Sequence, residues 1–170
     1  MFHYIKTVFP LIPELVHKCV FVFPKFTREN SKYSIEHKYK IINKFVRKVV
    51  KRFQAEVYVE GLENLPKDSN YCLVSNHLSS FDPLLIMSNI DSPTTFVAKI
   101  ETKKLPVVPQ IIKGLDGLFL ERDNLKQSFK VMMEVEKDLK KGEKNWLIFP
   151  EGTRNKDHMA LLKEFHHGTF

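Results

Sequence analysis

Beyond residue 53, short runs of β-branched and aromatic residues alternate with stretches of helical pattern. Such runs are typical of strands, and they predict strands at Gln54–Val59, Tyr71–Ser75, Thr94–Lys99, Gly117–Glu121 and Asn145–Phe149. Helices are predicted at Asp82–Asn89, which opens with Asp-Pro, and at Asn124–Lys141, which ends at Gly142. Strands that alternate with helices predict an α/β fold, with a central, mostly parallel or mixed sheet flanked by helices. Open sheets of this kind bind ligands in the loops after their strands.

The residues before this pattern predict a separate N-terminal segment, so we divide the chain into residues 1–53 and a domain over residues 54–170. Residues 25–52 hold ten Lys and Arg against two Glu, a balance of +8. The remaining residues hold 17 basic and 18 acidic side chains, a balance of −1. Ser34 suits a helix N-cap, and apolar residues then recur at helical spacing from Ile35 to Phe53. The segment therefore ends in a basic amphipathic helix.

Three interpretations of this basic helix stay open at this point. Its apolar face packs on a core while its charged face is solvated. Alternatively, its charged face lies against anionic lipid head groups, where each basic residue contributes about 1 kcal/mol. In the third interpretation it binds nucleic acid, but no nucleic-acid recognition motif accompanies it.

The apolar character of residues 1–26 favours lipid. Fourteen of these residues are large aliphatic or aromatic ones, and Lys6, Glu14 and Lys18 interrupt them. The longest stretches without charge or His, Thr7–Pro13 and Cys19–Pro24, are far shorter than the roughly 20 residues that span a bilayer. We therefore expect this segment to lie in the membrane interface rather than to cross the membrane, with a pair of core helices as the alternative.

Composition excludes several classes of protein. A content of 43% hydrophobic residues, with 14 Phe, excludes a disordered chain. The two cysteines, Cys19 and Cys72, exclude a zinc site of four cysteines. Both lie in apolar stretches, so we expect buried thiols in a reducing compartment, although a disulfide between them stays open.

The first candidate loop follows the predicted strand Tyr71–Ser75. His77 comes where this strand ends, and Asp82 comes where the next helix begins. Five residues are enough for the carboxylate to fold back onto the imidazole. A carboxylate on Nδ1–H fixes the tautomer, leaves Nε2 as an acceptor and stabilises the imidazolium, as a general base requires. The alternative is that Asp82 caps its helix and His77 is an ordinary loop residue.

The second candidate loop, Phe149–Asn155, also follows a predicted strand. Gly152 allows the backbone to turn and to approach a ligand closely, and Arg154 presents a planar fork that suits phosphate. Glu151 needs a partner in such a loop, either a substrate hydroxyl or a nearby cation. A surface turn is the alternative, but it leaves the run Pro-Glu-Gly-Thr-Arg unexplained.

Together the two loops resemble the glycerolipid acyltransferases, in particular the 1-acylglycerol-3-phosphate (lysophosphatidic acid) O-acyltransferases. The resemblance rests on Asn76-His77 followed by Asp82, and on Phe149–Arg154, and it runs from about Val57 to the end of the chain. The run Phe96–Glu101 is similar to the family's Ala-Lys-x-Glu segment. The run Gly117–Arg122 is similar, more loosely, to its second motif, with Glu121 where Asp is common.

This resemblance implies an enzyme of phospholipid biosynthesis that makes phosphatidic acid from lysophosphatidic acid. His77 removes a proton from the acceptor hydroxyl as the oxygen attacks an acyl thioester, and Asp82 holds the imidazole. The thioester is carried by coenzyme A or by acyl-carrier protein, and no metal or other cofactor is expected. The residues implied in substrate binding are Lys99, Arg122 and Arg154 for the phosphate, and Glu151, Gly152 and Thr153 for the acceptor pocket. No acyl-enzyme is needed, and the chain contains no Gly-x-Ser-x-Gly nucleophile motif.

The same resemblance implies an enzyme on the cytoplasmic face of a membrane, with the lipid surface and its two substrates as partners and without nucleic acid. Glycerol 3-phosphate or another lysophospholipid is an alternative acceptor, and an inactive lipid-binding remnant is an alternative of another class. Phe165–Phe170 resembles a Phe-Lys-x-Gly-like segment with His in place of Lys. The chain ends there, before the family's Val-Pro-x-x-Pro type motif, so we expect a C-terminal truncation. We interpret His158, His166 and His167 as loop residues rather than metal ligands.

Overall fold

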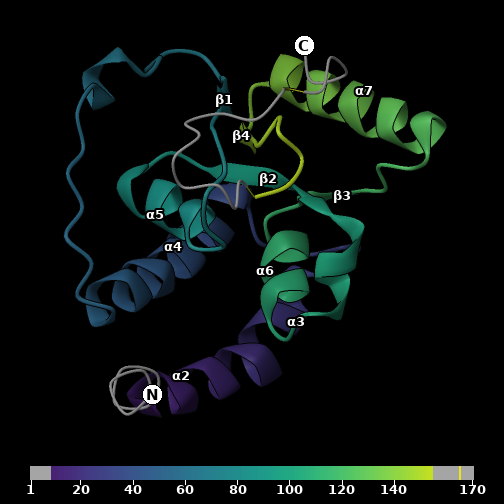
Figure 1. Ribbon diagram of the computed structural model, residues 1–170. Helices are drawn as coiled ribbons and strands as arrows, with labels where there is room; N and C mark the ends of the chain where they lie inside the picture. The colour runs from purple at the N-terminus through teal and green to yellow at the C-terminus, as the bar shows by residue number, and fades with distance from the viewer. Residues whose placement is uncertain (1–8, 155–164, 166–170) are drawn as a thin grey trace.

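The computed structural model describes residues 9–154 and 165. Its helices are α2 (Ile12–His17), α3 (Phe23–Phe26), α4 (Ile35–Arg52), α5 (Asp82–Asn89), α6 (Val108–Gly114) and α7 (Leu125–Lys141). Its strands are β1 (Cys72–Val74), β2 (Thr94–Lys99), β3 (Leu118–Leu120) and β4 (Asn145–Ile148). Figure 1 shows the strands in the middle of the molecule, with α7 on one side and α3, α4, α5 and α6 on the other.

The strands form one parallel sheet in the order β1-β4-β2-β3. The register pairs Leu73 with Leu147, Phe96 with Leu147, and Ala98 with Phe119. This result confirms the predicted α/β fold, and each of the four strands lies within one residue of its predicted bounds at either end. Because all strands are parallel, the loops after them meet at one edge of the sheet.

Both faces of the sheet are covered, and alternate strand residues serve the two faces. On one face, Phe96 and Leu147 pack against Ile42 and Val46 of α4 in a large apolar cluster that also takes residues from α3, α5 and α6. On the other face, Trp146 and Ile148 pack against Val135 of α7. The sheet is therefore covered on both faces, and the loops that follow its strands lie at its edge.

Helix α4 begins as the sequence predicts. The Oγ of Ser34 accepts a hydrogen bond from the His37 backbone N–H at 3.3 Å, which satisfies one of the free donors of the first turn. Its apolar face is buried in the core, as the first interpretation of the basic helix expects, and its outward cations are Lys40, Lys44, Arg47, Lys48, Lys51 and Arg52. One cation is exceptional: Lys38 is buried and donates to both oxygens of Asp116 at 3.1 and 3.2 Å.

Two polar residues of α4 hold the C-terminal end of α5. The hydroxyl of Tyr39 donates to the carbonyl of Ile90 at 2.8 Å, and the amide of Asn43 donates to the carbonyls of Met87 and Ile90 at 3.0 and 2.9 Å. Carbonyls in the last turn of a helix have no partner within the helix. These bonds therefore satisfy carbonyl groups that would otherwise be buried without a hydrogen-bond partner. They also fix α5, whose first residue is Asp82.

Tyr39→Phe should lower the free energy of unfolding by about 0.5–1.5 kcal/mol, the net value of one hydrogen bond. Burial raises the pKa of Tyr39 to about 12, whereas an unfolded tyrosine ionises near pH 10. The unfolded state therefore loses this proton first, and stability should fall as the pH rises from about 10 to 12. Urea unfolding at pH 8 and pH 11 tests this, since the fall should be smaller in Tyr39→Phe. An equal fall in the free energy of unfolding in both proteins would show that Tyr39 is not the group whose pKa is raised.

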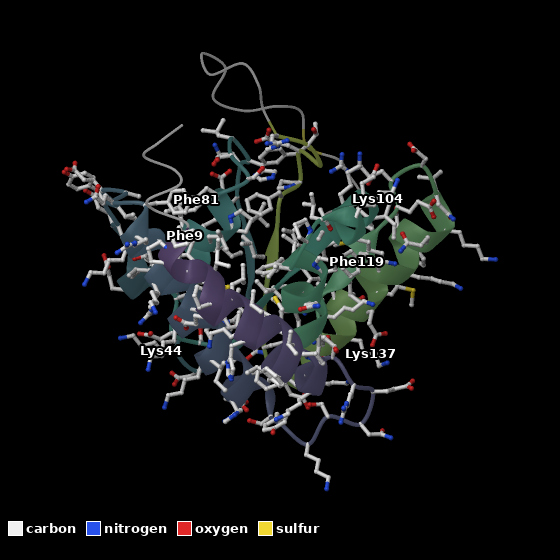
Figure 2. All side chains as sticks on the ribbon, turned by 90° about the horizontal axis from the view of Figure 1, so that it is seen from below. Phe9, Lys44, Phe81, Lys104, Phe119 and Lys137 are labelled. Carbon is white, nitrogen blue, oxygen red and sulfur yellow. The ribbon has the colours of Figure 1, made fainter. Side chains whose placement is uncertain are left out.

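The N-terminal helices are only partly buried. Phe23 and Phe26 belong to the core, as the alternative of core helices expects, but Phe9, Ile12, Val16, Val20 and Phe21 are 43–68% exposed. Helix α2 lies along the lower surface of the molecule, nearest the viewer in Figure 2, where Phe9 is labelled. Within residues 9–154, no helix combines the length and apolar character needed to cross a bilayer.

Two expectations from the sequence are wrong. Gln54–Val59 is not a strand: residues 54–60 are exposed, with Tyr58 at 87%. Strand propensity gives a strand only when the backbone has a neighbour to bond, and among the described residues β1 pairs with β4 alone. Cys72 is exposed rather than buried, because β1 is an edge strand and α7 covers the part of this face formed by β3 and β4. Cys19 is half-buried, and both thiols are free.

Candidate active site

His77 and Asp82 form a pair at the carboxyl end of β1. The Nδ1 of His77 lies 2.9 Å from Oδ2 of Asp82, and about four fifths of each side chain is buried. An ionised carboxylate only accepts hydrogen bonds, so Nδ1 carries the proton and Nε2 is the free acceptor. The structure therefore confirms the contact that the sequence spacing predicts, and this tautomer is the one that a general base needs.

Asp82 does not cap its own helix, which rules out the alternative for this residue. The N-cap residue of α5 is Phe81, and no side chain makes a capping hydrogen bond at this helix start. Instead, Oδ2 of Asp82 accepts from the backbone N–H groups of Leu78 and Ser79, each at 2.8 Å. The carboxylate thus organises the loop that carries His77 as well as its ring.

Glu151 lies beneath this loop and is 2% exposed. Its Oε1 accepts from the His77 backbone N–H at 3.0 Å, and its buried Oε2 has no hydrogen-bond partner among the described residues. Gly152 has a φ of +68°, which favours glycine, and its N–H donates to the carbonyl of Phe149 at 3.0 Å to close the turn. The ring of Phe149 stacks on the imidazole of His77, with 4.3 Å between centroids.

Arg154 joins the second loop to the first. Its Nη1 donates to Oγ of Ser80 at 2.8 Å, and the rest of its side chain is exposed. Thr153 is also exposed. The predicted set His77, Asp82, Glu151, Gly152 and Arg154 therefore forms one cluster. Phe149 and Ser80 belong to it as well, through the stacking on His77 and the bond from Arg154, and no pattern in the sequence indicated these two contacts.

Lys99 and Arg122 form a second cluster, at the ends of β2 and β3. Lys99 pairs with Glu101 at 2.6 Å, and this hydrogen bond lowers the pKa of Glu101. Burial lowers the pKa of Arg122, against the opposing effect of Glu101 and Asp123. The Nε of Arg122 is buried without a hydrogen-bond partner among the described residues, and the side chain as a whole is half-buried.

The two clusters share one edge of the sheet but lie apart along it. Strand β3 is three positions from β1 in the sheet, which is roughly 14 Å at the usual strand spacing. Figure 2 accordingly places Phe81, next to Asp82, and Phe119 of β3 on opposite sides of the molecule. A substrate that contacts both His77 and Arg122 must extend across the ends of β4 and β2.

Among the described residues, no group of three His, Cys, Asp or Glu side chains is arranged to hold a metal ion. His158, His166 and His167 lie outside the described residues, as does the end of the chain apart from Phe165.

Comparison with known proteins agrees with the geometry. A family model described as Acyltransferase matches residues 56–170. The chain is 30% identical over 101 residues to the 1-acyl-sn-glycerol-3-phosphate acyltransferase of Borreliella burgdorferi, covering 59% of this chain and 40% of that protein. It is 31% identical over 114 residues to 1-acyl-sn-glycerol-3-phosphate acyltransferase alpha of Homo sapiens, covering 67% of this chain and 40% of that protein.

A solved structure supports the same relation. The crystal structure of the 1-acyl-sn-glycerophosphate (LPA) acyltransferase PlsC from Thermotoga maritima matches with a TM-score of 0.70 at 30% identity, covering 92% of this chain and 62% of that one. The chain spans about two fifths of the length of the curated relatives named above. The family model covers well over half of this chain. By its sequence and its fold, the chain belongs to the acyltransferase family.

Proposed function

We propose that this protein transfers an acyl group from an acyl thioester to the free hydroxyl of 1-acylglycerol-3-phosphate, giving phosphatidic acid. The observation that carries the proposal is the contact between His77 and Asp82, 2.9 Å from Nδ1 to Oδ2, in a chain of the acyltransferase family. The names of the relatives, 1-acyl-sn-glycerol-3-phosphate acyltransferases, support the choice of acceptor. The donor is acyl-CoA or acyl-carrier protein, and the reaction as proposed needs no metal or other cofactor.

In the proposed step, Nε2 of His77 takes the proton of the acceptor hydroxyl while the oxygen attacks the thioester carbonyl. Asp82 stabilises the imidazolium that results. The carbon–sulfur bond of the tetrahedral intermediate then breaks, the thiolate receives the proton from His77, and the products are an ester and a free thiol. The imidazole returns to its starting state, and no acyl group passes through the enzyme.

Cations of both clusters supply the phosphate contacts of this proposal, Arg154 beside the pair and Arg122 and Lys99 across the ends of β4 and β2. Arg154 is exposed next to the His77 loop, and Arg122 is partly exposed just after β3. Lys99 is exposed beside Arg122, although it is engaged with Glu101. Gly152 and Thr153 directly precede Arg154 in the same loop, and in this proposal they border the acceptor.

We further propose that the reaction takes place at the cytoplasmic face of a membrane. Helix α2, the turn before it and the helical segment Lys18–Val22 after it present the exposed apolar side chains Phe9, Ile12, Val16, Val20 and Phe21. Lys48 of α4 pairs with Glu14 of α2, and other cations of α4 point outward. Apolar side chains beside cations are the pattern of a surface that binds anionic lipid.

A thiol-release assay tests the function. Purified protein is mixed with acyl-CoA or acyl-carrier protein, with and without lysophosphatidate, and free thiol and phosphatidate are measured together. We expect thiol release only with acceptor and in equal amount to phosphatidate. Binding to anionic vesicles without turnover of either donor would contradict the proposal and favour the lipid-binding remnant. Faster turnover of glycerol 3-phosphate or of another lysophospholipid would reassign the acceptor.

Arg122→Ala and Arg154→Ala should each raise the KM for lysophosphatidate about 10- to 100-fold with a smaller change in kcat. A hydrogen bond to a charged group contributes about 1.5–3 kcal/mol, and each 1.4 kcal/mol is about tenfold in affinity. Monoacylglycerol, which has the hydroxyl but no phosphate, is the control acceptor, and its kinetics should not change. Equal losses with both acceptors would show that the arginines do not bind the phosphate.

A further inference from the structure

The carboxylate of Glu151 faces inward, away from any substrate that would enter from solvent. The residue is 2% exposed, and its Oε2 has no solvent access and no hydrogen-bond partner among the described residues. Its Oε1 accepts from the backbone N–H of His77 at 3.0 Å. A buried carboxylate oxygen without a partner destabilises the fold, so the position of this residue needs an explanation other than stability.

Glu151 contacts His77, the residue that acts as the base in the proposed reaction. Three successive backbone N–H groups, of His77, Leu78 and Ser79, each donate to a carboxylate. Glu151 accepts the first and Asp82 accepts the other two, so the backbone of this loop is held by two acidic residues from different elements. None of these three N–H groups is then free to bind an oxyanion.

The ring of His77 is held by the same two segments. Asp82 bonds to Nδ1, and Phe149, two residues before Glu151, stacks on the ring at 4.3 Å with 29° between the planes. Because β1 and β4 are paired in parallel, the loops that follow them lie side by side (Figure 1). The segment after β4 therefore fixes both the main chain and the ring of His77.

We propose that Glu151 is a positioning residue for His77 and not a ligand of the acceptor. This inference rests on the proposed function, because it assigns Glu151 a task in that reaction. The carboxylate fixes the backbone of His77 so that Nδ1 meets Asp82 and Nε2 faces the acceptor hydroxyl. A displacement of about 1 Å at such a group is enough to cost about 100-fold in rate.

Steady-state kinetics separate the two roles of Glu151. In Glu151→Ala, we expect kcat to fall about 100-fold while the KM for lysophosphatidate stays within about threefold. In Glu151→Gln, the amide oxygen can still accept from His77 N–H, so kcat should stay within about tenfold of the parent. Glu60→Gln, at an exposed site in the segment between α4 and β1, is the matched control and should change neither constant. A rise of tenfold or more in KM with kcat unchanged in Glu151→Ala would overturn the proposal.

NMR of the protein without substrate gives a readout that does not depend on turnover. We expect the backbone amide and ring nitrogen signals of His77 to shift in Glu151→Ala and to stay close to the parent in Glu151→Gln. Unchanged His77 signals in Glu151→Ala would overturn the positioning role. If the parent protein turns over no donor, the proposed function fails, whereas the His77 signals still decide whether Glu151 fixes this residue.

Discussion

His77→Ala should lower kcat by about 10²–10⁴-fold, the usual contribution of a general base. The KM for lysophosphatidate should change little, because the cations and not the imidazole bind the phosphate in the proposed reaction. Thiol release and phosphatidate formation measure the effect at saturating donor. The ring stacks on Phe149 and bonds to Asp82, so circular dichroism and the thermal midpoint should be compared to show that the variant is folded.

His37→Ala is the matched control for this variant. His37 is an exposed histidine of α4 that stacks on Tyr33 with 5.2 Å between ring centroids, far along the chain from both candidate loops. We expect its kcat to equal that of the parent protein. A His77→Ala variant that is folded and retains more than a tenth of the parent kcat would exclude His77 as the base.

Asp82→Asn should lower kcat by about 10²–10³-fold while the fold is retained. The amide has a similar shape, but it lacks the charge that stabilises the imidazolium and can bond to the imidazole in the wrong tautomer. The bonds from the backbone N–H groups of Leu78 and Ser79 are also affected, because in the parent protein both go to Oδ2, the same oxygen that bonds to His77. Ring nitrogen signals of His77 measure the tautomer directly, and an unchanged tautomer together with unchanged kcat would contradict the role of Asp82.

The sheet was predictable because its strands are short, apolar and bounded by turn residues. Strand β2 begins and ends at the predicted residues, Thr94 and Lys99, since its buried first half and its partners on both sides agree with its local propensity. Helix α7 starts after Asn124, whose side chain accepts from the Gln127 N–H at 3.0 Å, and ends at Gly142 with φ +77°. At these places, local chemistry and tertiary packing favour the same structure.

Helix α6 was not predictable from the local pattern. Its sequence, Val108–Gly114, is short, has no side-chain N-cap and holds the β-branched residues Val108, Ile111 and Ile112, which are poor helix signals. Packing decides instead, because Ile112 and Gly114 are buried against the core and Gly114 lies close to Ile42 and Phe26. Residues 54–59 show the opposite case: their local pattern predicts a strand, but they form none, because they have no neighbouring strand among the described residues.

The candidate site was predictable in its members but not in all of their contacts. Spacing along the chain brings Asp82 to His77, because both lie in one short loop. The contact between Glu151 and His77 depends on the pairing of β1 with β4 across 74 residues, which no local pattern contains. For that reason the sequence indicated a substrate or a cation as the partner of Glu151, whereas the structure gives it a backbone N–H.

A double-mutant cycle on His77 and Asp82 tests the central mechanism most directly. If the carboxylate acts through the imidazole, Asp82→Asn lowers kcat in the parent protein but has no further effect in His77→Ala, since the group on which it acts is gone. We therefore predict that the double variant has the same kcat as His77→Ala alone. A double variant in which the two losses multiply in full would contradict the account.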